Sequence, residues 1–420
     1  MFSQRSDFHV LYNPYLIPYS LSLFLPCVCV CVCVCVCVCV CVCVCVCVCV
    51  CVCVCVCVCV CVCVCVCVCV FLGTGSSVLS VLQDLPSPPW PCRSKMEKHL
   101  QCISVLQWVI SFLALGLSAT VLLIYMFCTD CWLIAAMYTA WLIFDWNTPK
   151  QGGRRSSWVR NWTVWTYFRD YFPVRLIKTH DLLPSRNYIF GYHPHGIFCF
   201  GAFCNFGTEA TSFSKKFPGI KPSLATLAGN FRFPVLRDYL MSGGICPVNK
   251  NSIDYLLTCN GTGNAVVIVV GGAAESLECA PGKNSVTLSR RKGFVRLALE
   301  KGSDLVPVYS FGENDAYQQI IFEEGSWWRL VQRKMQKIVG FAPCLFHGCS
   351  FFSAETWGIV PYCKPITTVV GEPITVPKVE EPTPDVVDQY HAMYIQSLQC
   401  LFDKYKTHFG LKESDVLEIL

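Results

Sequence analysis

The stretch YIFGYHPHG, residues 188–196, decides the fold, because an apolar run of strand length ends abruptly in two histidines around a proline. Short apolar runs of this kind, bounded by glycine or proline, are typical of buried strands. Four of them are predicted strands: 187–192, 265–270, 305–310 and 367–370. Residues 289–301 have the periodicity of an amphipathic helix, which Gly302 ends. Strands that alternate with helices predict an α/β fold, in which helices flank a mixed sheet.

Polar or glycine-rich clusters follow three of these strands at the point where each strand ends. The clusters are residues 193–196, 271–276 and 311–314. In open α/β sheets, ligands bind beyond the carboxyl ends of the strands. Three clusters in the same topological position therefore predict an active site at that edge of the sheet.

His193 and His195 are the candidate bases for this site. The unperturbed pKa of an imidazole, about 6.5, suits proton transfer near neutral pH. Glu275 is our choice for the carboxylate that orients the imidazole and stabilises its charged form. Metal binding and purely structural roles for the histidines stay open as alternatives, although no further ligands with metal-site spacing accompany them, so no metal is expected.

Transfer of an acyl group to an alcohol needs oxyanion donors as well as a base. Gly196, Gly271 and Gly272 allow close backbone approach and can present N–H groups to an oxyanion. The chain has no G-x-S-x-G nucleophile elbow, so a covalent acyl-enzyme is not predicted.

The composition is that of a membrane protein, with 54% hydrophobic and only 15% charged residues. Residues 102–146 are almost entirely apolar, and we predict a transmembrane hairpin there, with arms at 103–127 and 131–144. Basic residues flank both ends of the hairpin, so both ends should stay cytosolic. A single span, or a buried helix in a soluble core, is the alternative.

The N-terminal segment is unlike the rest of the chain. Residues 27–70 alternate strictly between cysteine and valine and hold 22 of the 35 cysteines. A repeated TG dinucleotide encodes this pattern, so we interpret it as translated repeat DNA rather than an evolved structure. The predicted organisation is an unreliable N-terminus at 1–75, a linker at 76–101, the hairpin at 102–146 and a catalytic domain at 147–420.

Two basic segments lie within the predicted domain, in a chain whose net charge is +5. The first contains Arg290, Arg291, Lys292 and Arg296, which could bind phosphates such as those of coenzyme A. A solvated helix face explains the same charges equally well. The second, residues 327–339, mixes basic and apolar residues and could lie on a bilayer or on the surface of the domain.

Several sequence motifs of the chain resemble those of the type 2 diacylglycerol acyltransferases and their monoacylglycerol and wax-alcohol relatives. The family's His-Pro-His-Gly stands at 193–196 and its Tyr-Phe-Pro at 171–173. Its long signature runs from Arg291 to Glu313. Its neutral-lipid pattern Phe-Leu-x-Leu matches Phe112, Leu113 and Leu115.

The resemblance implies a membrane-anchored acyltransferase that esterifies diacylglycerol with the acyl group of acyl-CoA. It implies a multi-pass protein of the endoplasmic reticulum that also reaches lipid droplets, with its catalytic domain facing the cytosol. Acyl-CoA, diacylglycerol and membrane lipids are the expected partners, with no cofactor and no nucleic acid. Self-association into a homo-oligomer stays open.

Other functions stay open as well. Within the class, the acceptor could be monoacylglycerol, retinol or a long-chain alcohol; outside it, the chain could be a non-catalytic protein of the lipid-droplet surface. More distant glycerophosphate acyltransferases pair a histidine with an aspartate five residues on, but Phe198 and Phe200 occupy those positions here. Any carboxylate partner must therefore come from elsewhere in the chain.

Overall fold

The computed structural model describes residues 93–341, 343–351 and 357–420. All described residues belong to one compact unit, Leu72–Leu420. The interpretation of the Cys-Val repeat therefore lies outside the described residues. The predicted linker is partly replaced by a helix, because α4 already begins at Arg93 and spans Arg93–Ile110.

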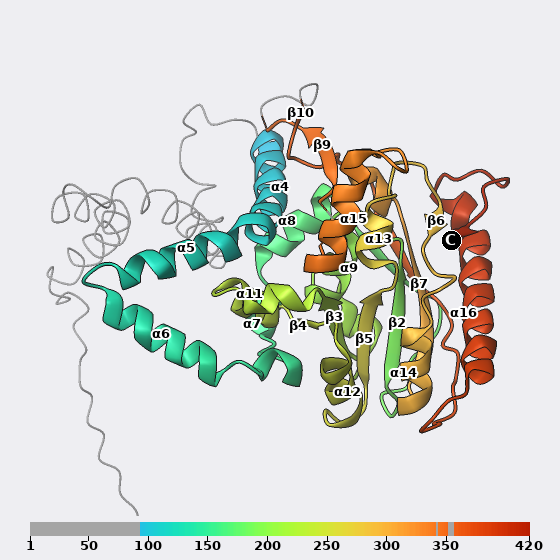
Figure 1. Ribbon diagram of the computed structural model, residues 1–420. Coiled ribbons are helices and arrows are strands. Elements are labelled where there is room, and N and C mark those ends of the chain that lie inside the picture. Colours follow the sequence, from blue (N-terminus) through green and yellow to red (C-terminus); the bar gives the residue numbers. More distant parts are fainter. Residues whose placement is uncertain (1–92, 342, 352–356) are drawn as a thin grey trace, which may run out of the picture. The chain divides into compact units, whose positions relative to one another are not determined.

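A seven-stranded mixed sheet forms the centre of this unit (Figure 1). Its strand order is β1-β11-β7-β2-β5-β3-β4, in which β2, β3, β4, β5 and β7 run parallel and β11 runs antiparallel to β7. The strands are β1 (Arg175–Lys178), β2 (Tyr188–His193), β3 (Lys221–Thr226), β4 (Ile245–Pro247), β5 (Asn264–Val269), β7 (Asp304–Phe311) and β11 (Thr367–Val370). All four predicted strands are thus present, and the mixed α/β architecture is confirmed.

Helices cover both faces of the sheet, and an apolar core lies on each face. Successive residues of a strand point to opposite faces and so contribute to different cores. In β2, Phe190 packs into one apolar core and Ile189 into the other. The first core includes residues of α4, α8 (Thr163–Tyr171), the π-helix η3 (Phe203–Gly207) and α11 (Leu236–Ser242). The second includes residues of α12 (Lys250–Thr258), α14 (Gly293–Lys301) and α16 (Pro384–Tyr405).

The helix predicted at 289–301 begins four residues later, at Gly293, and ends at the predicted Gly302. Gly302 adopts a left-handed conformation with φ 63°, which suits the residue that ends a helix. Shorter helices complete the domain: η2 (Thr148–Gln151), α7 (Ser157–Arg160), α9 (Phe200–Ala202), α10 (Phe213–Lys216), η4 (Ala228–Arg232), α13 (Gly272–Ser276), η5 (Glu313–Ala316) and η6 (Lys406–Phe409).

Two small sheets lie outside the main one. β8 (Gln318–Ile320), β9 (Leu345–Cys349) and β10 (Trp357–Gly358) form an antiparallel sheet, and α15 (Trp327–Val339) lies between β8 and β9 in the sequence. The parallel pair of β6 (Ser285–Val286) and β12 (Glu418–Ile419) ties the C-terminus to the domain.

The apolar hairpin differs from its prediction. Residues 95–127 form a continuous helical segment of α4, the π-helix η1 (Ser111–Leu115) and α5 (Gly116–Phe127), which is long and apolar enough to cross a membrane. Its first half, however, packs into the domain, where Val105 and Val109 are fully buried. Only α5 and α6 (Trp132–Phe144) form a hairpin with mostly exposed apolar side chains. The α5–α6 pair projects from the body of the domain in Figure 1.

Candidate active site

The three predicted clusters meet at one edge of the sheet. β2 lies between β5 and β7, and all three strands run in the same direction. Their carboxyl ends therefore place residues 193–196, 271–276 and 311–314 side by side. The prediction that these clusters come together is confirmed by the strand order.

His195 follows the end of β2, and one nitrogen of its ring is held by the backbone. Its Nδ1 lies 3.0 Å from the carbonyl oxygen of Gly196, which can only accept a hydrogen bond. Nδ1 therefore carries the proton, and the lone pair is on Nε2. Burial lowers the pKa of His195 below its usual 6.5, so the ring is neutral at physiological pH and can accept a proton.

Glu275 lies beside His195, as predicted, but contacts its main chain rather than its ring. One carboxyl oxygen accepts a hydrogen bond from the backbone N–H of His195 at 2.5 Å, and the other accepts from the backbone N–H of Thr287 at 2.7 Å. Within the described part of the chain no hydrogen bond joins Glu275 to the imidazole, so the structure does not form the predicted contact, and the carboxyl oxygens meet backbone N–H groups instead. Glu275 fixes the loop that carries the histidine, and burial raises its pKa to about 7.

Glu313 is a second buried carboxyl group at the same loop, and our sequence reasoning gave it no role. It accepts hydrogen bonds from the hydroxyl group of Tyr192 at 2.6 Å and from the backbone N–H of Gly201 at 3.0 Å. Burial raises its pKa to about 7 as well. The sequence signal that could have identified Glu313 as a site residue was its place in the third strand-end cluster, 311–314. Two carboxyl groups thus hold the loop after β2 from two sides.

His193 has a different environment from His195, since its side chain is fully buried in the sheet. The hydroxyl group of Tyr394 donates to the carbonyl oxygen of Gly191 and accepts from Nε2 of His193, each at 3.0 Å. The buried Nδ1 has no hydrogen-bond partner among the described residues. Burial lowers the pKa of His193 to about 3. This histidine is placed to pack rather than to meet a substrate.

Two of the predicted oxyanion glycines are explained by close packing. A Cβ atom at Gly271 would lie 2.1 Å from a carboxyl oxygen of Glu275, and one at Gly196 would lie 2.9 Å from Cγ of Glu313. These glycines give the two carboxyl groups room to approach the loop. Gly272 differs, because it lines the cavity described next.

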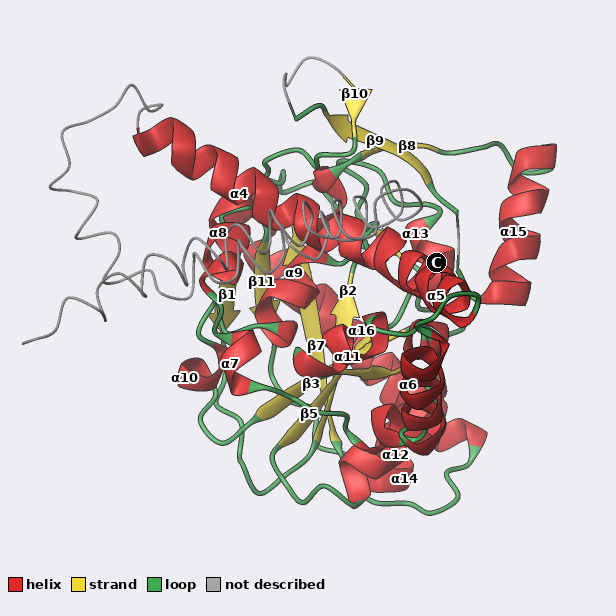
Figure 2. Ribbon diagram, turned by 90° about the vertical axis from the view of Figure 1, so that its left-hand side faces the viewer, coloured by secondary structure: helices red, strands yellow, loops and turns green. Residues whose placement is uncertain are grey.

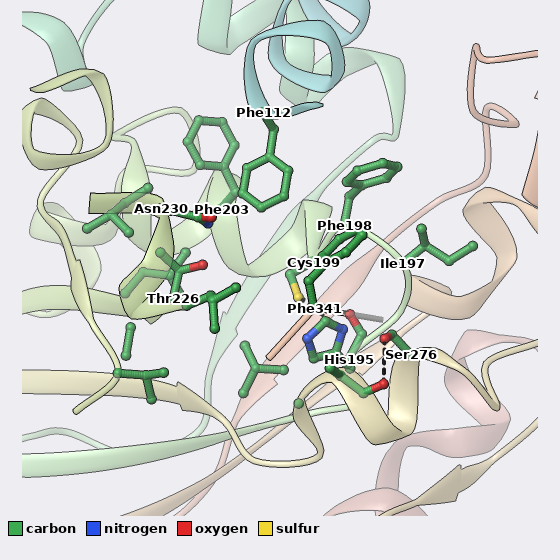
Figure 3. A pocket seen from close by; sticks show the side chains of 18 of the residues that line it. Phe112, His195, Ile197, Phe198, Cys199, Phe203, Thr226, Asn230, Ser276 and Phe341 are labelled. Carbon is green, nitrogen blue, oxygen red and sulfur yellow. Dashed lines mark hydrogen bonds between the residues drawn. The ribbon is translucent and has the colours of Figure 1, made fainter. Parts of the chain in front are cut away.

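An apolar cavity of about 260 Å³ opens beside His195 (Figure 3). Phe112 and Leu113, two of the three predicted neutral-lipid residues, line it together with His195. Leu115, the third, packs against the core instead. Thr226, Asn230 and Ser276 are among the few polar residues in an otherwise apolar lining. Such a lining suits an acyl chain or a lipid alcohol more than a polar metabolite.

Cys199 also lines the cavity and lies close to His195, but it is not an activated nucleophile. Its Sγ donates to the carbonyl oxygen of His195 at 3.0 Å, and it lies 3.6 Å from Nδ1. Burial raises the pKa of this thiol well above its usual value, so the reactive thiolate is disfavoured.

The predicted phosphate-binding residues lie at the start of α14 and on its surface. A guanidinium N–H of Arg291 donates to the carbonyl oxygen of Gly271 at 3.3 Å, next to Gly272 of the cavity lining. Lys292 forms an ion pair with Asp388 at 2.6 Å. Arg290 and Arg296 are exposed. Arg291 is therefore the member of this group that the structure brings to the site.

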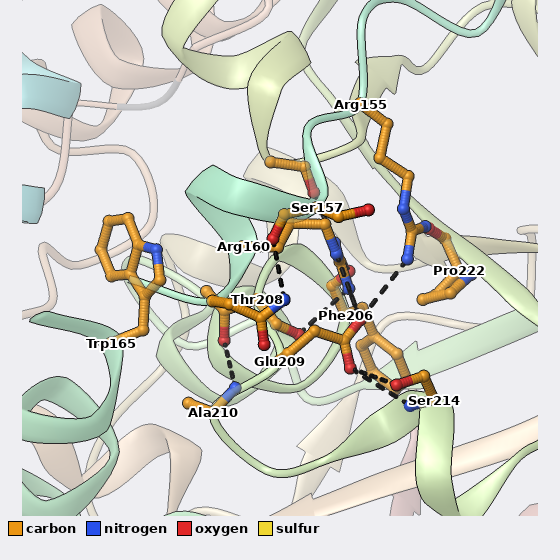
Figure 4. Close-up of polar contacts among 12 residues, drawn as sticks. Arg155, Ser157, Arg160, Trp165, Phe206, Thr208, Glu209, Ala210, Ser214 and Pro222 are labelled. Atoms are coloured by element: carbon orange, nitrogen blue, oxygen red, sulfur yellow. Dashed lines mark hydrogen bonds and ion pairs between the residues drawn. The ribbon is translucent and has the colours of Figure 1, made fainter. Parts of the chain in front are cut away.

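A buried arginine supports the cavity wall (Figure 4). Arg160 donates to the carbonyl oxygens of Phe206 at 2.8 Å and Thr208 at 3.0 Å, and it forms an ion pair with Glu209 at 2.9 Å. These acceptors lie in and just after η3, whose first residue, Phe203, lines the cavity. The arginine thus fixes the π-helix that shapes the apolar wall.

Fold and site together define an α/β domain in which a neutral histidine lines an apolar cavity at the carboxyl edge of the sheet. A family model described as diacylglycerol acyltransferase matches residues 124–420. The chain is 76% identical over 347 residues to diacylglycerol O-acyltransferase 2 of Danio rerio, which covers 83% of this chain and 96% of that protein. It is 72% identical over 348 residues to the protein of the same name from Xenopus tropicalis, with the same coverage of 83% and 96%.

A solved structure, the 1-acyl-sn-glycerophosphate acyltransferase of Thermotoga maritima, aligns with a TM-score of 0.32 and 10% identity. That alignment covers 74% of this chain and 98% of the other, and at this level it carries no further argument. The chain belongs to the diacylglycerol acyltransferase family. The resemblance seen in the sequence motifs is confirmed.

Proposed function

We propose that the chain is an acyl-CoA-dependent O-acyltransferase that esterifies 1,2-diacylglycerol to triacylglycerol. The observation that carries the proposal is that the unprotonated nitrogen of His195 belongs to a residue lining an apolar cavity. Family membership supports the substrate pair. His195 is the base, and His193 supports the strand end.

In the proposed reaction, Nε2 of His195 removes the hydroxyl proton of the acceptor as its oxygen attacks the thioester carbon. The C–S bond then breaks, and the protonated imidazole returns the proton to the departing thiolate of coenzyme A. The acyl group passes directly between the substrates, without a covalent acyl-enzyme. The backbone N–H of Gly272 is the proposed oxyanion donor, and Arg291 with Arg290, Lys292 and Arg296 is the proposed contact for the phosphates of acyl-CoA.

We further propose that α5 and α6 anchor the domain in one leaflet of the membrane. These helices have 12 and 13 residues, so each is about 18–20 Å long at 1.5 Å per residue. The hydrocarbon core of a bilayer is about 30 Å thick, so neither arm crosses it. Such an anchor also fits the phospholipid monolayer of a lipid droplet. The domain would then face the cytosol at the endoplasmic reticulum and at droplets.

The test is an acceptor panel with labelled acyl-CoA in microsomes that contain the full chain. Diacylglycerol should be esterified faster than monoacylglycerol, retinol or a long-chain alcohol. His195→Ala should lower the turnover number by about 10²–10⁴-fold while the protein remains membrane-bound. Full activity of this variant, or a clear preference for another acceptor, would contradict the proposal.

A further inference from the structure

The polarity of α15 is the reverse of that of an ordinary surface helix. Its exposed side chains include five large apolar ones, which we call the apolar face: Trp327, Trp328, Leu330, Met335 and Ile338. Ile338 is 73% exposed, whereas the polar Arg329 and Gln332 are only 3% and 5% exposed. A helix that buries polar groups and exposes apolar ones is placed to meet an apolar environment.

The buried polar side of α15 is held firmly against the domain. Arg329 forms an ion pair with Glu278 and donates to the carbonyl oxygen of Leu277 at 3.4 Å. Gln332 donates to the carbonyl oxygen of Pro343 at 2.8 Å. Because these bonds fix the rotation of the helix, the apolar face points outward. Figure 2 shows α15 at the right-hand edge of the molecule, away from the main sheet.

The charges around the apolar face indicate an anionic lipid surface as its partner. At 100° per residue, Lys334 lies within the apolar arc and Lys337 at its border. Neither lysine has a carboxylate partner within the described part of the chain. Long lysine side chains beside exposed tryptophans suit the headgroup layer, where the ammonium groups meet phosphates and the rings meet acyl chains. A second copy of this helix would bring like charges together.

The C-terminal end of α15 leads directly to the cavity. Gly340 and Phe341 line the cavity beside His195, and Phe341 is 43% exposed, so it lies at the mouth. Leu113, at the root of the hairpin, also lines the cavity and is 37% exposed. The mouth is therefore bordered by the end of α15 and by the root of the proposed membrane anchor.

We propose that α15 is a second membrane-binding element, which seats the mouth of the cavity on an anionic leaflet so that the lipid acceptor enters past Phe341. This inference rests on the proposed function, since the acceptor alcohol is taken to be a membrane lipid. It adds a contact surface and an entry route that the hairpin alone does not provide.

The first test is photocrosslinking of the full chain in microsomes, which needs no catalytic activity. The photoreactive amino acid p-benzoylphenylalanine is placed at Ile338 or, as a matched control, at the equally exposed Val416 near the C-terminus (71% exposed). We expect crosslinks to phospholipid at position 338 and not at 416. Crosslinks at 338 to protein only, or equal lipid crosslinks at both positions, would overturn the inference.

The second test separates acceptor entry from chemistry in proteoliposomes. The triple variant Trp327→Gln/Trp328→Gln/Ile338→Gln should raise the KM for long-chain diacylglycerol in the bilayer by about fivefold or more. Its rate with water-dispersed dioctanoylglycerol should be unchanged, and Leu183→Gln/Val416→Gln should behave as the parent protein. Equal losses with both acceptors would contradict an entry role. Activity of the parent with no lipid crosslink at 338 would refute this inference alone.

Lys334 and Lys337 can be tested for their contact with anionic lipid. In vesicles with phosphatidylserine, Lys334→Gln/Lys337→Gln should raise the KM for long-chain diacylglycerol, and this increase should vanish in vesicles of phosphatidylcholine alone. The same increase in both kinds of vesicle would show that the lysines do not recognise anionic lipid.

Discussion

His193 and His195 are two residues apart, yet hydrogen bonding gives them different states. The ring of His195 has its proton on Nδ1, because this nitrogen lies 3.0 Å from the carbonyl oxygen of Gly196, which can only accept a hydrogen bond. The ring of His193 donates through Nε2 to Tyr394 and is fully buried. The sequence predicted both as candidates, but the choice between them depends on side-chain direction, which a motif does not contain.

The same limit applies to the carboxyl group chosen for the site. Chain order correctly placed Glu275 next to His195, because both follow adjacent strands of one parallel sheet. It did not reveal that the backbone N–H groups of His195 and Thr287 occupy both carboxyl oxygens. A carboxyl group that the chain order places beside a histidine can therefore hydrogen-bond the backbone of the histidine's loop instead of the imidazole ring.

At the residue scale, the contribution of Glu275 to the stability of the chain should fall as the pH rises from about 4.5 to 7. The pKa of Glu275 is raised from 4.5 to about 7, so the folded state retains a proton that the unfolded state has lost. The stabilisation is complete below pH 4.5 and is lost as the pH passes 7, by about 3 kcal/mol at 1.36 kcal/mol per pKa unit.

Thermal unfolding of the detergent-solubilised chain at several pH values would measure this. Relative to the parent, Glu275→Gln should gain stability as the pH rises through this range, because Glu313, whose pKa is also raised to about 7, and the buried histidines titrate in both proteins. The exposed Glu413 provides a control, because Glu413→Gln should leave the profile unchanged. A profile of Glu275→Gln that parallels the parent would show that Glu275 does not titrate in this range.

At the scale of elements, the hairpin is docked on α11 by a buried ion pair. Arg237 of α11 donates to Asp145, just after α6, at 2.7 Å to the carboxyl group and at 2.6 Å to the carbonyl oxygen. Arg154 pairs with the same carboxyl group at 2.6 Å. At the other arm, a Cβ at Gly116 would lie 2.8 Å from Cβ of Phe233, so α5 lies against the segment before α11. Both arms thus meet α11, next to the cavity.

Arg237→Met should therefore loosen the hairpin. Loss of one partner of a buried ion pair costs about 3–5 kcal/mol when the other charge stays buried without a partner. The cost here should lie below that range, because Arg154 still pairs with the carboxyl group of Asp145. The expected results are a lower thermal midpoint and faster limited proteolysis between Asp145 and Arg154. Arg232→Met is the matched control, since Arg232 is exposed on the neighbouring element. Equal protease resistance of Arg237→Met and the parent would contradict this role.

The strands of the main sheet that we predicted share a strong sequence signal. Strands β3 and β4, which we did not predict, lack it. Continuous apolar runs predicted β2, β5, β7 and β11. β3 has the sequence KPSLAT, in which Lys, Pro and Ser break the apolar pattern, and β4 has only three residues. These strands form by pairing with β5 and with each other, a long-range contact that local sequence does not encode.

For the whole molecule, apolarity alone could not separate membrane anchor from protein core. The apolar stretch at 102–146 was predicted as one hairpin, but residues such as Val105 and Trp108 bury themselves in the domain. Similarly, the basic and apolar pattern of 327–339 left two placements open. The structure places Arg329 and Gln332 against the domain and the apolar side chains outward, and this arrangement supports the proposed contact with a bilayer. In both segments the missing information is which side of a helix the domain covers.

The proposed reaction depends on proton transfer by the imidazole of His195. The most direct measurement is chemical rescue of His195→Gly by added imidazole, with labelled acyl-CoA and diacylglycerol in microsomes. The cavity left by the missing ring should admit imidazole, and activity should rise with its concentration and in proportion to its unprotonated fraction. Restoration of part of the lost rate in His195→Gly is the predicted result. No rescue of His195→Gly, together with rescue of His193→Gly, would contradict the account.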